Sequence, residues 1–184
     1  MNFLELAKKR KTTFEFSDKI VSDKNIYLLL EAARWAPSCA NIQPWHFIVV
    51  KNKKQIDKLM KTVNYGFFHE TPPQLIACVL LNERCAEPNH SCFRGIKPAT
   101  HDSFMCVGIA AAQICLEAED LGISSCLLTP KQKESKKILK IGKKDVVPLL
   151  VGLGYEKKNT FKRKRERIDL KKLVSKEYFG ERYL

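Results

Sequence analysis

Hydrophobic positions along the chain repeat with two different periods, which indicates helices alternating with strands. Apolar residues spaced three or four positions apart mark one face of a helix, and short apolar runs rich in β-branched residues mark strands. The sequence predicts helices over residues 2–10, 22–35, 53–63, 101–121, 131–140 and 169–174. It predicts strands over residues 45–51, 74–82, 124–128 and 146–153, and an extended segment over residues 11–16. This order favours an α+β fold, an α/β sandwich around one sheet.

One predicted strand is apolar on both faces, and one predicted helix is apolar over most of its surface. The strand over residues 74–82 has no polar alternation, as expected when both faces of a sheet are covered. The helix over residues 101–121 keeps apolar residues at helical spacing, and Ile109, Ala110 and Ala112 extend its apolar surface further. A helix of this kind is buried. We therefore expect a central helix or a subunit interface.

The length of 184 residues suits a single domain spanning residues 1–184. Residues 84–100 contain Pro88, Gly95 and Pro98 and are predicted to form a loop. Because structureless loops of this length are uncommon, we expect a functional lid. Residues 156–184 are predicted to form a basic C-terminal arm.

Composition indicates the cellular compartment of the protein and whether a membrane or a metal is involved. No apolar run approaches the roughly 20 residues that span a bilayer, and the start of the chain is predicted to be an amphipathic helix, not a signal peptide. No membrane partner is therefore expected. The odd count of seven cysteines favours a reducing, cytoplasmic location. Cys85, His90 and Cys92 lie close in sequence but lack a CxxC spacing, so no metal site is expected.

The formal net charge of +13 is densest over residues 157–172. Nucleic-acid binding, phosphate binding and a solvated lysine-rich surface are each compatible with this run. The chain lacks an RRM-like aromatic motif and a clear helix-turn-helix. The sequence therefore favours the solvated surface, with part of the run holding a phosphate, over a nucleic-acid partner.

The most informative stretch is residues 31–50, where a helix end, a polar turn and a strand follow one another. Pro37 ends the helix because proline lacks a backbone N–H and clashes with the preceding turn. The turn holds Asn41 and Gln43, whose amides can both donate and accept hydrogen bonds. Such a loop beside a strand allows a flat heteroaromatic ligand to approach the backbone.

This stretch resembles the FMN-dependent nitroreductase family, which has a Pro-Ser-x-x-Asn-x-Gln-Pro-Trp-x-Phe pattern. The matching residues are Pro37, Ser38, Asn41, Gln43, Pro44, Trp45 and Phe47. The resemblance implies a nitroreductase-like mixed sheet flanked by helices, built as an intertwined homodimer. It also implies two FMN pockets at the subunit interface.

The resemblance also assigns residues to the phosphate of FMN. Arg10, Lys11 and Thr12 are similar to the family's Arg-Arg-Ser turn, although a basic helix C-terminus would look the same. The family has a further basic residue in the C-terminal arm that closes on this phosphate. Arg165 and Arg167 are the candidates, with Arg163 nearby, and spacing does not decide among them.

For the flavin ring, the resemblance implies Pro37, Ser38, Asn41 and Gln43 from the partner subunit, with Cys39 filling space in the same loop. Leu127, Thr129 and Pro130 match the segment that lies against the ring and offers backbone N–H groups near N5. One departure is Phe14, where the family usually has a second basic residue near the ring. Lys11, Asn64 and His69 are candidates to replace that charge.

The function implied is hydride transfer from NAD(P)H through FMN to an electron-poor acceptor such as a nitroaromatic or a quinone, by a ping-pong mechanism. The flavin would do the chemistry, so no catalytic side chain is assigned. The sequence has no GxGxxG, so the nicotinamide donor would bind only transiently. The alternative is a non-catalytic FMN-binding, storage or sensing protein. His46, near the predicted pocket, is expected to be a core or sheet-edge histidine.

Overall fold

The computed structural model describes residues 2–63, 71–85, 95–158, 160 and 164–183, with the backbone alone at residues 83, 85 and 96–99. Its centre is a four-stranded sheet in the order β1-β2-β4-β3, and neighbouring strands are antiparallel. The strands are β1 (Trp45–Val50), β2 (Gln74–Leu80), β3 (Ser124–Leu128) and β4 (Val146–Gly154). Within the described residues, the parallel component of the expected mixed sheet is one bridge between Thr12 and Ser125.

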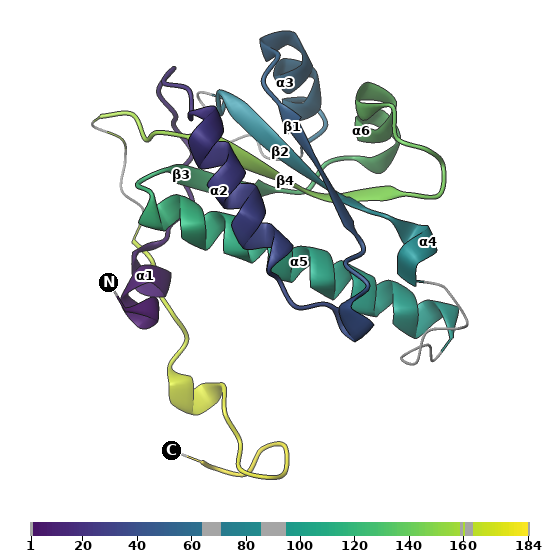
Figure 1. Ribbon diagram of the computed structural model, residues 1–184. Coiled ribbons are helices and arrows are strands. Elements are labelled where there is room, and N and C mark those ends of the chain that lie inside the picture. Colours follow the sequence, from purple (N-terminus) through teal and green to yellow (C-terminus); the bar gives the residue numbers. More distant parts are fainter. Residues whose placement is uncertain (1, 64–70, 86–94, 159, 161–163, 184) are drawn as a thin grey trace.

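Helices cover both faces of the sheet, which gives three layers (Figure 1). α2 (Asp23–Arg34) and α5 (Ile96–Asp120) pack on one face, and α3 (Lys53–Met60) and α6 (Gln132–Leu139) pack on the other. Strand β2 serves both cores: Ile76 and Cys78 face α2 and α5, whereas Leu75 and Ala77 face α3 and α6. Every residue of β2 is buried, which confirms the prediction from its continuous apolar run.

The helices begin where short polar residues cap them. The Ser22 hydroxyl accepts a hydrogen bond from the backbone N–H of Asn25 at the start of α2, and Asn52 does the same for Gln55 at the start of α3. At the N-terminus, Asn2 and Glu5 form a capping box that starts α1 (Phe3–Lys9).

Helix α5 begins at Ile96, earlier than its predicted start at residue 101. Pro98 lies in the first turn, where a missing N–H costs nothing because no helical carbonyl would accept from it. At the other end of the predicted loop, Asn82–Cys85 form the short helix α4. The ends of the 84–100 segment are therefore helical and not loop, and residues 86–94 lie outside the described residues.

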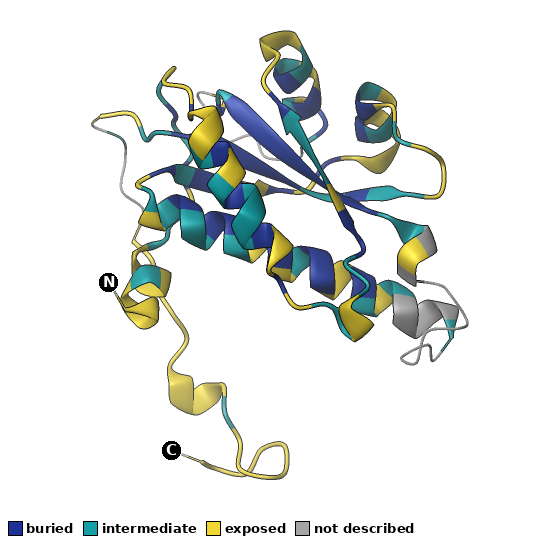
Figure 2. Cartoon of the chain, in the orientation of Figure 1, coloured by how far each residue is buried: buried dark blue, intermediate teal, exposed yellow. Residues whose placement is uncertain are grey.

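Helix α5 is apolar on two sides, but only one of them is covered in a single chain. Val107, Ala110 and Ile114 are fully buried against the sheet and α2. On the uncovered side Phe104, Met105 and Ile109 are 43%, 59% and 42% exposed (Figure 2). The predicted burial of this helix is thus confirmed on one face alone.

Beyond residue 164 the C-terminal arm runs away from the body of the molecule (Figures 1 and 2). The helix predicted over residues 169–174 is a single 3-10 turn, η2 (Leu170–Lys172). The arm has large apolar side chains that the described part of the chain leaves exposed, including Ile168, Leu170, Leu173, Tyr178 and Phe179. No helix among the described residues is long and apolar enough to cross a membrane.

Candidate flavin-binding site

The first half of the site is the turn that follows α1, residues 10–13, which we call the phosphate turn. The chain leaves the helix at Arg10, and the next residues run beside β3. Thr12 forms a bridge with Ser125, and the Thr13 N–H donates to the Ser125 carbonyl over 3.0 Å. The phosphate turn is thereby fixed to the edge of the sheet.

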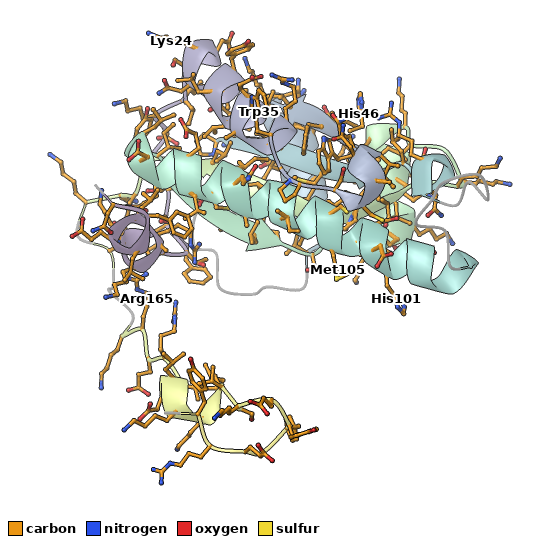
Figure 3. All side chains as sticks on the ribbon, turned by 60° about the horizontal axis from the view of Figure 1, so that its bottom comes forward. Lys24, Trp35, His46, His101, Met105 and Arg165 are labelled. Carbon is orange, nitrogen blue, oxygen red and sulfur yellow. The ribbon has the colours of Figure 1, made fainter. Side chains whose placement is uncertain are left out.

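The C-terminal arm returns to this turn through one arginine. The Arg165 guanidinium donates to the backbone carbonyl of Arg10 at 2.5 Å and to that of Lys8 at 2.7 Å. These carbonyls belong to the end of α1, where helical partners are missing. Figure 3 shows Arg165 beside the N-terminal helix, at the far left of α5. Segments 155 residues apart therefore meet at the phosphate turn.

The structure separates the candidate arginines of the arm. Arg167 donates to the carbonyl of its neighbour Glu166 and makes no hydrogen bond to the phosphate turn. Arg163 lies outside the described residues. Of the two described candidates, Arg165 is the one placed to close on a ligand at the turn.

Lys11 is held by a carboxylate of its own chain. Its Nζ lies 2.6 and 2.7 Å from the two carboxylate oxygens of Glu156, just beyond β4, in a partly buried pair. The lysine therefore ties the phosphate turn to the end of β4. Its charge is neutralised, which argues against Lys11 as the replacement for the basic residue missing at Phe14. Asn64 and His69 lie outside the described residues.

The donors at the turn fit an anionic phosphate. Thr12 is exposed, and the neighbouring Thr13 is 2% exposed with a hydroxyl oxygen that has no hydrogen-bond partner in the structure. The Arg10 guanidinium is half-buried beside α5. Burial raises the pKa of the Cys115 thiol there, while a hydrogen bond from Ser125 and the Arg10 charge act in the opposite direction. A half-buried cation and a buried hydroxyl without a partner suit a phosphate group.

The second half of the site is the loop Pro37 to Gln43, which we call the ring loop. It contains the single turn η1 (Cys39–Asn41). Three of its residues that are not glycine have positive φ: Ala40 at 46°, Asn41 at 55° and Gln43 at 49°. Such conformations cost about 1–3 kcal/mol each and persist where the surroundings enforce them, often at functional sites.

Hydrogen bonds hold the ring loop in this shape. The Ser38 hydroxyl accepts from the backbone N–H of Gln43 at 3.0 Å. The Gln43 amide donates to the backbone and side-chain oxygens of Asn41, both at 3.2 Å. Arg84 of α4 donates to the Gln43 carbonyl at 3.0 Å. Sequence reasoning missed Arg84, because a contact across 41 residues leaves no local pattern.

The residues of the ring loop differ in exposure. Pro37 and Asn41 are exposed, whereas Ser38 and Gln43 are half-buried. Cys39 packs against the core formed by α2 and α5. The loop thus presents a proline ring and an amide to its surroundings.

Just before the ring loop, three side chains at the end of α2 form a fixed cluster. Glu31 accepts hydrogen bonds from the Arg34 guanidinium and from the Trp35 indole N–H. These bonds lower the pKa of the Glu31 carboxyl to about 2. Trp35, labelled in Figure 3, remains 72% exposed, and the Arg34 guanidinium lies over its ring, 5.0 Å from the ring centroid. Arg34 and Trp35 follow Glu31 by three and four residues, a helical spacing from which this cluster could have been predicted.

The segment after β3 supplies the third set of predicted residues. Leu127 and Thr129 are exposed, and Pro130 is buried in a bridge with Val63 beyond α3. His46, by contrast, is exposed on the edge strand β1 (Figure 3), as expected for a sheet-edge histidine. Side chains are not described for Cys85, His90 and Cys92.

The phosphate turn and the ring loop lie toward opposite ends of α5 in one chain (Figure 1). The α1 end is marked by a 3.4 Å ion pair between Lys9 and Glu119, near the C-terminus of α5. The ring loop lies beside the N-terminal half of the same helix. A single chain therefore presents two half-sites and does not bring them together.

Comparison with known proteins gives a consistent picture. The profile of the nitroreductase family matches residues 7–155. A protein of Archaeoglobus fulgidus named "Putative NADH dehydrogenase/NAD(P)H nitroreductase" is 32% identical over 84% of this chain and 85% of its own length. The solved structure of an FMN-dependent nitroreductase from Clostridium difficile R20291 superposes with a TM-score of 0.78 at 25% identity, covering 96% of this chain and 100% of that one. NfrA1 of Bacillus megaterium shares the fold, with a TM-score of 0.82 at 19% identity over 96% of this chain and 74% of that one.

The chain belongs to the nitroreductase family. The predicted resemblance and the α+β fold class are thereby confirmed. The family match and the names of its relatives support an oxidoreductase.

Proposed function

We propose that the protein is an FMN-dependent NAD(P)H oxidoreductase whose two flavin pockets form between two copies of the chain. The observation that carries this proposal is the meeting of Arg165 with the phosphate turn. Two guanidinium groups from the two ends of the chain lie at one turn, next to an unsatisfied buried hydroxyl. A phosphate is the group that this set of donors fits.

In the proposed complex, Arg10, Arg165 and the Thr12 hydroxyl hold the phosphate of FMN. The exposed segment at Leu127 and Thr129 offers backbone N–H groups to the ring. The partner's ring loop covers the ring with Pro37 and directs the Asn41 amide at its polar edge. Arg84, Ser38 and Gln43 keep that loop in its strained shape, so little ordering remains to be done when the ligand binds.

The homodimer follows from what one chain leaves uncovered. The face of α5 exposes three large apolar side chains and the arm exposes several more, whereas a monomer surface usually carries such residues singly. A second copy would cover both and would carry a ring loop to each phosphate turn. The arm, which extends from the body, can then clasp the partner.

Bound FMN would supply the redox chemistry by accepting hydride from NAD(P)H and then reducing an electron-poor acceptor in a ping-pong cycle. The protein's part is to position the two reactants in turn on one face of the ring. The buried cysteines Cys78, Cys106, Cys115 and Cys126 are free thiols, which supports a reducing, cytoplasmic setting.

The absorbance spectrum of the purified protein tests the proposal. We expect flavin bands that bleach when NADH or NADPH is added without oxygen and return when a quinone is added. A colourless protein that also fails to bind added FMN would rule the proposal out.

A non-catalytic FMN-binding role is the second candidate, and Phe14 is the observation that favours it. With an aromatic residue in place of the family's cation, and with Lys11 neutralised by Glu156, the reduced anionic ring would lack a stabilising charge. Under this candidate, bound flavin is not reduced by either nicotinamide, and Phe14→Arg makes it reducible. Bleaching of the unaltered protein within seconds excludes this candidate.

A further inference from the structure

Most of the excess positive charge is concentrated in two regions. Residues 157–172 of the arm hold nine basic and two acidic residues. Residues 52–62 and 131–145, which form α3, α6 and their flanks, hold eleven lysines and three carboxylates, with no arginine. The remainder of the chain has thirteen basic and fifteen acidic residues, so it is slightly negative. The sequence pattern indicated only the basic run in the arm and not the second region.

The second region is one surface, which we call the lysine face. Helices α3 and α6 contact each other and cover the same side of the sheet (Figure 1). Their apolar residues Ile56, Leu59 and Leu139 point into the core beneath them. The lysines are consequently on the outside, where all but Lys136 are exposed.

The charges of the lysine face are not neutralised by the chain. Among the described residues, none of the eleven lysines is within ion-pair distance of a carboxylate, and Lys136 donates to the Lys143 carbonyl. Some lysines elsewhere do form ion pairs, as Lys9, Lys11 and Lys51 show. The face is therefore a source of uncompensated positive potential.

The residue types on this face restrict its partner. It exposes no large hydrophobic side chain within residues 52–62 and 131–145, so it offers nothing for base stacking or for insertion into lipid. Stable protein interfaces are depleted in lysine and enriched in arginine and aromatic residues. Lysine does bind phosphate as a point charge. A phosphorylated small molecule, attracted by charge, fits best.

One edge of the lysine face adjoins the proposed flavin pocket. Pro130, which ends the segment assigned to the ring, forms an antiparallel bridge with Val63, and the Lys131 N–H donates to the Thr62 carbonyl at 2.9 Å. This register places Lys61 and Lys131 on neighbouring backbone segments, directly beyond Thr129. The Gln132 side chain fixes this corner by bonding the backbone N–H and carbonyl of Val147 at 2.8 and 2.7 Å.

We propose that Lys61 and Lys131 recognise the 2′-phosphate of NADPH at the entrance to the flavin pocket, so that the enzyme prefers NADPH to NADH. The inference rests on the proposed function, because it uses the ring position at Leu127 and Thr129. The remaining lysines of the face raise the local concentration of the anionic dinucleotide and steer it to this corner. NADPH differs from NADH only by that phosphate, so two adjacent lysines with uncompensated charge suffice to discriminate.

A binding measurement without turnover tests this directly. The probes are 2′,5′-ADP, which carries the 2′-phosphate, and 5′-AMP, which lacks it, each titrated by calorimetry at 50 mM and 200 mM salt. We expect 2′,5′-ADP to bind about tenfold more tightly than 5′-AMP, by a margin that shrinks as salt increases. The variant Lys61→Gln/Lys131→Gln should remove that margin.

The matched control is Lys53→Gln/Lys54→Gln, which removes the same charge at the other end of α3, about 12 Å from Lys61. This control variant should retain most of the difference in affinity between 2′,5′-ADP and 5′-AMP. Equal affinity for the two probes in the unaltered protein would overturn the proposal, as would an equal loss in both variants. Tighter binding of a 20-base-pair DNA duplex at 200 mM salt would also overturn it, by assigning the face to a polyanion.

Kinetics provide the second readout. In the Lys61→Gln/Lys131→Gln variant, kcat/KM for NADPH should fall about tenfold while the value for NADH and both kcat values stay within twofold. Flavin content and the bleaching by NADH are measured alongside. If these are normal and the NADPH preference is absent, this inference fails while the proposed function stands; if flavin is not bound at all, the proposed function fails instead.

Discussion

The phosphate turn and the ring loop are built in opposite ways. The phosphate turn depends on distant parts of the chain, since β3, the end of β4 and the arm all hold it. The ring loop is largely self-contained, because Ser38, Asn41 and Gln43 bond to one another within six residues. The first half is assembled by tertiary contacts and the second by local hydrogen bonds. In the dimer that we propose, each half meets its counterpart from the other subunit to form a pocket.

The largest expected effect comes from keeping the two halves apart. Ile109→Glu places a charge on the exposed face of α5, where we propose that the partner packs. We expect monomers by light scattering and at least about a 100-fold loss of FMN affinity, because a buried unpaired charge disrupts an interface strongly. Lys58→Glu, on the opposite face of the sheet, should change neither. A monomer with undiminished FMN affinity would disprove the shared pocket.

The phosphate turn should be the more sensitive half to single side chains. Arg10→Ala and Arg165→Ala are each expected to weaken FMN binding by about 10- to 100-fold, the usual effect of removing a charged hydrogen-bond donor from a phosphate. Flavin fluorescence titration measures this. Arg167→Ala is the matched control and should stay within twofold. A larger effect at Arg167 than at Arg165 would reverse the assignment made from the hydrogen bonds.

Single substitutions in the ring loop should have smaller effects than those in the phosphate turn, because several hydrogen bonds together hold the loop. Ser38→Ala removes the acceptor for the Gln43 N–H and should lower the unfolding free energy by about 1 kcal/mol and FMN affinity by about fivefold. Ser22→Ala removes a comparable hydroxyl bond at the start of α2 and should affect stability alone. Denaturant melts and FMN titrations distinguish the two. Equal losses of affinity would mean that the loop has no direct part in binding.

The smallest effect concerns the thiol in the ring loop. Cys39 is half-buried and should react with iodoacetamide several-fold more slowly when FMN is bound. Burial raises the pKa of Cys78 and Cys126 to about 12, so at pH 8 both remain protonated and unreactive until the protein unfolds. Mass spectrometry of labelled peptides gives all three rates at once. If Cys39 reacts at the same rate with and without FMN, the flavin ring does not bind at this loop.

Much of the fold was predictable because its signals are local. The continuous apolar run of β2 and the helical spacing of the apolar residues over α2 identified these elements from sequence alone. The start of α5 was placed too late, since Pro98 and Gly95 suggest a loop although both are tolerated at the beginning of a helix. The choice between Arg165 and Arg167, the pairing of Lys11 with Glu156 and the role of Arg84 could not be predicted. Each depends on segments brought together from more than 40 residues apart.

The sequence by itself determined the family, the alternation of helices and strands, and the polar character of the ring loop, because these depend on short spacings and on the residue types within them. Tertiary structure alone decided which charged side chains form ion pairs and which do not. It put Arg165 on the phosphate turn, joined the lysines of α3 and α6 into one face beside Pro130, and left the outer side of α5 uncovered. The physical reason is that charge acts through space, so its effect depends on neighbours that the chain order does not reveal.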